Sequence, residues 1–280
     1  MSDLVPLSTA APLVTPPNRL YDFRRGIIRA APTILLTLLI LALWEILVSV
    51  FNIQQFLLPP PSAILNAFSD HFPELMESAQ MAVYEAAGGL ILGTILAVSA
   101  GLIAVRWNVA SRALIPFAIA FNAVPTLVFA PIMNNWFGSV NPLSKMMIVV
   151  TLVYYPIMIN VVRGLTNVDP LALELIHSYG ASNAAIFRKL RWPNMLPYFL
   201  NALKLGATLS VIGTVVAGYF GGQRAALGVW ILNEVVLFRF PSAWAGILVA
   251  CLIGIGFYLV VALIERLVIP WHASMRGEEH

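Results

Sequence analysis

Six apolar runs, each long enough to cross a lipid bilayer, occupy most of this 280-residue chain. A helix of about 20 apolar residues spans the hydrocarbon core of a membrane. The runs are residues 31–51, 81–105, 114–137, 143–162, 195–220 and 244–269. Only 10% of the residues are charged, against about 25% in soluble domains. The sequence therefore predicts an all-α polytopic membrane protein with six transmembrane helices.

The basic residues predict which side of the membrane each end of the chain occupies. Loops on the cytoplasmic side of membrane proteins are enriched in Lys and Arg. Of the 16 Lys and Arg residues, twelve fall in the two tails and in the second and fourth loops, and residues 30–105 contain none. Both termini are therefore expected in the cytoplasm. Basic residues this thinly spread favour orientation over phosphate binding, so no nucleic-acid partner is expected.

Three segments follow from the apolar runs. Residues 1–29, rich in Pro, Ser and Thr, are predicted to be a disordered cytoplasmic tail, residues 30–271 a transmembrane domain, and residues 272–280 a cytoplasmic tail. The first apolar run is longer than the apolar core of a secretory signal and is interpreted as an uncleaved span. In the second run, Gly89 and Gly93 lie four residues apart on one helix face, which predicts close packing against another helix.

The fourth loop, residues 163–194, is predicted to contain two helices. Asp169 followed by Pro170 is typical of a helix start, because the Asp side chain accepts a hydrogen bond from a free N–H and proline lacks an N–H that would have no partner there. Apolar residues then recur every four positions, which predicts an amphipathic helix that Gly180 ends. These apolar residues are Leu171, Leu175 and Tyr179.

The second predicted helix of this loop begins with Ser182 or Asn183 as its N-cap. It continues through Leu190, and Pro193 is expected to end it. One interpretation of the two helices is an interfacial pair that lies on anionic headgroups, which the basic residues would favour.

Residues 174–193 also resemble the EAA signature of permeases of ATP-binding-cassette (ABC) importers. ELIHSYG at residues 174–180 has the acidic residue of this signature and, six positions later, its Gly, and LRWP at residues 190–193 has its apolar-x-apolar-Pro end. The departures from the signature change size but not polarity: Leu175 and Ile176 replace the frequent Ala, and Leu190 and Trp192 replace the frequent Ile and Leu.

Three further segments resemble permeases for sulfonates, taurine, nitrate and vitamin precursors. They are LPPPSAIL at residues 58–65, GYFGGQRAALG at residues 218–228 and ERLVIPW at residues 265–271. With the six spans, they extend the resemblance over most of the chain. The chain is thus identified as a member of the binding-protein-dependent ABC importer permeases.

This resemblance implies a type I ABC importer permease fold in a bacterial plasma (inner) membrane. It implies a second permease copy, expected as a homodimer, together with two ATPase subunits and an extracytoplasmic solute-binding protein. ATP and Mg would be bound by the ATPase subunits, and no cofactor is expected in this chain.

The resemblance also implies roles for particular residues. Coupling to the ATPase is expected to depend on the fourth loop, because capped helices can transmit a push that a flexible loop would absorb. The coupling candidates are Glu174, Gly180, Ala181, Ser182, Leu190 and Pro193. The candidates for lining the translocation pathway are Asn122, Thr126, Asn201, Thr208 and Thr214.

The residue inventory does not predict an enzyme. The sequence has no GxxxxGK[ST] phosphate-binding loop, so ATP hydrolysis must occur in another chain. The four His residues show no metal-binding spacing, and the four Asp residues lie outside the predicted spans. No catalytic or metal site is therefore expected.

The alternative function is a self-contained, ion-coupled secondary transporter. Glu45, Glu85 and Lys204 fall within or at the ends of apolar runs, where ionisable groups are costly and often functional. We interpret Glu45 and Glu85 instead as reaching the headgroups or water, and Lys204 as extending toward the cytoplasmic side.

The resemblance implies a sulfonate, taurine, nitrate or a vitamin precursor as the substrate, and no dedicated anion-binding Arg lies inside the predicted spans. This lack favours a neutral or weakly charged heteroaromatic vitamin precursor, of the pyrimidine or riboflavin type, over a sulfonate, taurine or nitrate.

Overall fold

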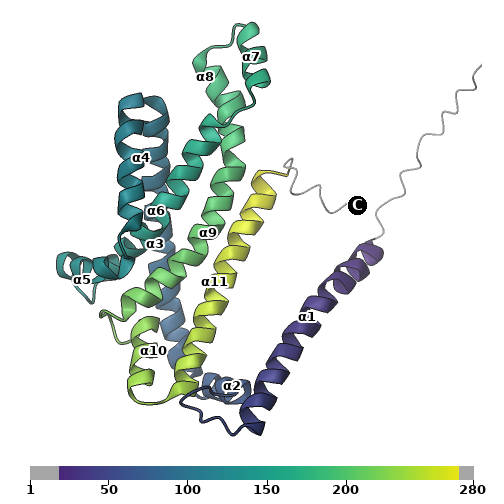
Figure 1. The fold of residues 1–280 in the computed structure, drawn as a ribbon, viewed down its shortest axis with the longest axis vertical. Helices are drawn as coiled ribbons and strands as arrows, with labels where there is room; N and C mark the ends of the chain where they lie inside the picture. Colours follow the sequence, from purple (N-terminus) through teal and green to yellow (C-terminus); the bar gives the residue numbers. More distant parts are fainter. Residues whose placement is uncertain (1–18, 271–280) are drawn as a thin grey trace, which may run out of the picture. The chain divides into compact units, whose positions relative to one another are not determined.

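The computed structural model of the protein describes residues 19–270, and all regular structure in these residues is helical (Figure 1). The helices in chain order are α1 (Arg19–Val50), α2 (Pro61–Asp70), α3 (Phe72–Arg106), α4 (Asn108–Ala123), α5 (Thr126–Phe137), α6 (Pro142–Thr166), α7 (Pro170–Ser178), α8 (Asn183–Ile186), the π-helical turn η1 (Phe187–Arg191), α9 (Trp192–Gly218), α10 (Leu227–Val236) and α11 (Phe240–Val268). The predicted all-α fold class is confirmed.

The chain forms two compact units, residues 1–53 and residues 54–280. The first contains α1, which begins at Arg19, so residues 19–29 are helical where a disordered tail was predicted. Extending a helix costs far less than starting one, which explains why the basic segment before the apolar run continues the helix. The rest of the predicted N-terminal tail and the predicted C-terminal tail lie outside the described residues.

Within residues 19–270, five helical segments are long and apolar enough to cross a membrane. They correspond, within two residues at their C-terminal ends or with longer ends, to the first, second, fourth, fifth and sixth predicted spans and are residues 31–50, 72–106, 142–166, 183–218 and 240–268. A sixth span is obtained if the bent pair α4 and α5 is counted as one.

The third predicted span, residues 114–137, is not one straight helix. The two helices α4 and α5 are bent by 104° relative to each other. Pro125 accounts for the break, because proline lacks an N–H and disfavours a helical conformation in the residue before it. Val124 is accordingly extended, with φ −73° and ψ 127°. The third predicted span is therefore made of two shorter helices that meet at this bend.

The three helices α3, α6 and α9 pack together as the core of the second unit. One face of α6 is fully buried in this core, and its residues are Val149, Val153, Ile157 and Val161. The prediction that Gly89 and Gly93 permit close packing is confirmed. A Cβ added at Gly89 would lie 2.5 Å from Val149 Cβ, and one at Gly93 would overlap Val153 Cγ2.

We predict that Gly93→Ala lowers the thermal midpoint of the purified protein, because its methyl group would force α3 away from α6. Overpacking of this kind costs about 1–3 kcal/mol, more than the roughly 1 kcal/mol that Ala gains over Gly within a helix. Gly256→Ala in α11 is the matched control, since no atom lies within 4 Å of the added Cβ. Equal midpoints for the two variants would contradict the importance of this contact.

Candidate functional site

Helix α7 and its flanking turns contain most of the predicted coupling residues. The Asp169 side chain accepts a hydrogen bond from Leu171 N at 3.0 Å, and Pro170 is the first residue of the helix, as predicted. Gly180 follows the C-terminal end of α7 with a positive φ of +70°, which confirms the predicted stop. Nothing lies within 4 Å of a Cβ added at Gly180, so its backbone conformation, and not a lack of space, favours glycine there.

The apolar face predicted for α7 has no partner among the described residues. Leu171 is 74% exposed, Leu175 58% and Tyr179 81%. Within the second unit, Figure 1 shows α7 and α8 at one end of the helices and α10 at the other. A contiguous apolar face that remains exposed is typical of an interaction surface.

The second helix of the loop begins as predicted but does not end at Pro193. The Ser182 side chain caps α8 by accepting a hydrogen bond from Ala185 N at 3.3 Å. The helix then passes through η1, where Trp192 N bonds to Phe187 O, and continues as α9. The wider π-helical turn ends at Arg191, two residues before Pro193, so the missing proline N–H falls in the first turn of α9, where it is tolerated.

The six coupling candidates therefore fall into two groups. Glu174, Gly180, Ala181 and Ser182 lie on α7 and the turn after it, whereas Leu190 and Pro193 lie at the junction of η1 and α9. The first group is exposed apart from the half-buried Ala181, and both residues of the second group are half-buried.

Asn194 connects the two ends of this loop and was missed by the sequence analysis. Its Nδ2 donates to Gly164 O at 2.8 Å and to Asn167 O at 3.0 Å, at the C-terminal end of α6. A Cβ added at Gly164 would lie 2.7 Å from Met195 Cα, so α6 and α9 are also in close contact there. Only the position of Asn194 directly after Pro193 could have drawn attention to it.

The pathway candidates are distributed over three helices. Asn122 is exposed on α4, and Thr126 is the first residue of α5. On α9, Asn201 is exposed and Thr208 is half-buried, and their seven-residue spacing places them on one face. Thr214 is buried, and its hydroxyl donates to Ser210 O at 3.0 Å. The structure thus groups Asn201 with Thr208 and separates Thr214 from them.

Two ionisable residues, Glu85 and Lys145, are buried, although Glu85 was interpreted as reaching the headgroups or water. Glu85 is 1% exposed, because α3 begins at Phe72 and places Glu85 well inside the helix. Its carboxylate has no hydrogen-bond partner in the described part of the chain and interacts electrostatically with Lys145. Lys145, near the start of the fourth apolar run, is fully buried in the first turn of α6, and its Nζ donates to Ser139 O at 2.7 Å.

The side chain of Lys204, interpreted as extending toward the cytoplasmic side, has a charged partner near the C-terminal end of α11. Its Nζ forms a 2.8 Å ion pair with Glu265 Oε2, and both side chains are less than one-fifth exposed. The pair joins α9 to α11. Because its members are 61 residues apart, sequence periodicity gave no signal for it.

Comparison with known proteins agrees with this arrangement. The protein family described as binding-protein-dependent transport system inner membrane component matches residues 89–271. The chain belongs to this family. It is therefore a permease component of an ABC importer, and the interpretation as an ion-coupled carrier loses its support.

Three relatives of this permease illustrate the range of the family. It is 30% identical to the formylaminopyrimidine transport permease protein ThiX of Halalkalibacterium halodurans, over 84% of this chain and 93% of that protein. It is 28% identical to the riboflavin transport system permease protein RibX of Chloroflexus aurantiacus, over 85% and 88%. It is 25% identical to the putative aliphatic sulfonates transport permease protein SsuC of Bacillus subtilis, over 94% and 92%.

A solved structure shows the same fold. The crystal structure of an amino acid ABC transporter with histidines matches 72% of this permease and 97% of that chain, with a TM-score of 0.52 and 17% identity. The type I ABC importer permease fold expected from the sequence is confirmed.

We predict that Lys204→Met destabilises this permease by about 3 kcal/mol, because it leaves the Glu265 carboxylate buried without its partner. The double variant Lys204→Met/Glu265→Gln removes both charges and is expected to recover most of the loss in detergent unfolding experiments. The exposed Lys189, changed to Met, controls for the loss of a positive charge. A double variant no more stable than Lys204→Met would contradict a pairwise interaction.

Proposed function

We propose that this permease forms the translocation pathway of an ABC importer and that α7 receives the conformational change of the ATPase. The observation that carries this proposal is the exposed apolar face of α7, formed by Leu171, Leu175 and Tyr179. The helix is capped at its start and is followed by a defined glycine turn, so it can move as a rigid element. We propose the cytoplasm as the location of this end of the molecule, in accord with the distribution of basic residues.

The connections of α7 support its proposed role. Three residues separate it from α6, and the Asn194 hydrogen bonds join the end of α6 to the start of α9. A displacement of α7 would therefore act on α6 and α9 together. Helix α9 carries Asn201 and Thr208, which we propose line the pathway together with Asn122 and Thr126.

The proposed assembly has two copies of this permease, two ATPase subunits that bind ATP and Mg, and an extracytoplasmic solute-binding protein. The exposed face of α9 that contains Asn201 and Thr208 also contains the exposed Leu205 and Ile212. A pathway between two copies would give the polar side chains of this face an aqueous environment, which they lack against lipid.

We expect Gly180→Val to reduce ATP-dependent uptake about tenfold when permease and ATPase are reconstituted with the solute-binding protein. A β-branched residue at φ +70° costs about 1–2 kcal/mol and would displace the turn after α7. Gly180→Asn is the matched control, since Asn tolerates this conformation, and it should retain most of the activity.

Glu174→Arg tests the same surface through charge and is expected to weaken co-purification of the ATPase. Glu77→Arg is its control, because Glu77 is equally exposed but lies on α3, far in the sequence from the loop. Normal assembly and uptake for both Gly180→Val and Glu174→Arg would show that α7 is not the coupling element.

The substrate we propose is a weakly charged heteroaromatic compound of the pyrimidine or riboflavin type. The names of two relatives, ThiX and RibX, give formylaminopyrimidine and riboflavin as their substrates. In addition, the one lysine in each of the helices α6 and α9 is engaged: Lys145 with Ser139 O and Lys204 with Glu265. Neither is free to bind an anionic substrate.

The cognate solute-binding protein should therefore bind pyrimidines or flavins in a calorimetric screen that also contains alkanesulfonates, taurine and nitrate. Binding of the same compound must stimulate ATP hydrolysis by the reconstituted complex. Tight, exclusive binding of a sulfonate or of nitrate would overturn the proposed substrate class and leave the importer function intact.

A further inference from the structure

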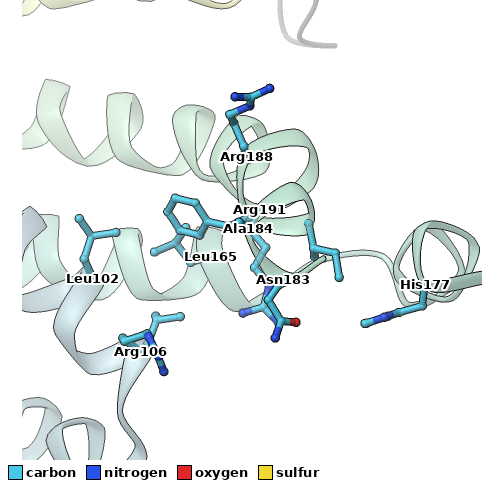
Figure 2. Close-up of a pocket in the computed structure, with 11 residues that line it drawn as sticks. Leu102, Arg106, Leu165, His177, Asn183, Ala184, Arg188 and Arg191 are labelled. Atoms are coloured by element: carbon cyan, nitrogen blue, oxygen red, sulfur yellow. The ribbon is translucent and has the colours of Figure 1, made fainter. Parts of the chain in front are cut away.

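A cavity of about 850 Å³ lies where the end of α3 meets the loop between α6 and α9 (Figure 2). Its apolar wall includes Leu102 and Val105 in the last turns of α3 and Leu165 near the end of α6. With 35 residues, α3 is about 52 Å long, whereas the hydrocarbon core of a bilayer is about 30 Å thick. The helix is therefore longer than the core is thick, and its basic C-terminal residue Arg106 is expected at the depth of the lipid headgroups.

The polar part of the cavity is strongly basic. It contains Arg106, Arg188 and Arg191 together with His177 and Asn183, and none of the described residues that line it is Asp or Glu. None of the three Arg side chains forms an ion pair within the described residues. In Figure 2 the Arg188 side chain points away from Arg106 and Asn183, so Arg106 and Arg191 are the better candidates for binding an anion inside the cavity.

The cavity is distinct from the surface proposed to contact the ATPase. On α7, His177 lines the cavity, whereas Leu175 belongs to the exposed apolar face. Two residues apart on a helix, these side chains point about 200° apart. The two surfaces therefore lie on opposite sides of α7, and both can be occupied at the same time.

We propose that this cavity binds the phosphate headgroup of an anionic phospholipid, with Arg106 and Arg191 at the phosphate and the acyl chains along the apolar wall. The proposal rests on the proposed function in one respect, the placement of this end of the molecule at the cytoplasmic leaflet. That leaflet carries anionic lipids, and basic pockets between transmembrane helices at its surface bind their headgroups. A free anion would use the Arg residues but not the apolar wall.

The test is native mass spectrometry of the full-length permease in detergent, titrated with phosphatidylglycerol or with phosphatidylcholine of the same acyl chains. One phosphatidylglycerol is expected to bind more tightly than the rest. Arg106→Gln/Arg191→Gln should weaken this first binding step roughly thirtyfold, since each Arg near a membrane surface contributes a factor of about five. Should the double variant fail to fold, Arg191→Gln alone is titrated, with a loss of about fivefold expected.

Arg112→Gln/Lys189→Gln is the matched control, because it removes the same charge from two exposed residues that do not line the cavity. It should leave the first binding step unchanged. Equal binding of the two lipids, or equal losses in both double variants, would overturn the proposal. Saturation by glycerol 1-phosphate at the same concentration as by phosphatidylglycerol would also overturn it, in favour of a free-anion site.

A rival occupant is an acidic side chain of the ATPase. If Arg106→Gln/Arg191→Gln keeps its affinity for phosphatidylglycerol but loses co-purifying ATPase, the cavity belongs to that interface and the lipid proposal is wrong. The lipid titration uses the permease alone, so it can be interpreted even if no ATPase co-purifies. A failure of the importer function is thereby distinguished from a failure of the lipid site.

Discussion

The close contact of α6 with both α3 and α9 is the constraint on which the position of every proposed functional element depends. A bilayer offers no hydrophobic driving force between helices, so their association depends on close packing, hydrogen bonds and small residues. Here Gly89 and Gly93 of α3 admit the Val residues of α6, and Gly164 of α6 admits the backbone of α9 at Met195. Because α7 follows α6 after three residues, this packing also determines where α7 begins.

The same packing explains how a loop can act on helices of the core. At the end of α6, the contact of Gly164 with Met195 and the two hydrogen bonds of Asn194 join α6 to α9 across the whole loop. These contacts fix the two ends of the loop relative to each other. Helix α7 and the turn at Gly180 lie between these two ends. The ends cannot shift without moving two helices that also contact α3.

The features predicted correctly from the sequence are those determined over a few residues. The caps at Asp169 and Ser182 and the stop at Gly180 depend on local backbone geometry, and the Gly89–Gly93 spacing depends on one helix face. The break at Pro125 could not be singled out, because prolines are tolerated in membrane helices. Pro116, Pro131 and Pro156 lie inside α4, α5 and α6. Pro193 was misread because the π-helical turn before it has no sequence signature.

The surroundings of the buried charges could not be predicted from the sequence, because no local sequence pattern identifies the groups that they contact. Glu45, Glu85 and Lys204 raised the alternative of an ion-coupled transporter, since ionisable groups in a membrane are often functional. In the structure Lys204 pairs with Glu265 of α11, and Lys145 bonds to the turn before its own helix. These contacts lie at different points of the bundle and connect neighbouring segments, so they account for the two lysines without a path for ions. The cost of burying these charges is offset by the ion pair of Lys204 and the hydrogen bond of Lys145, and the ion pair also connects α9 to α11.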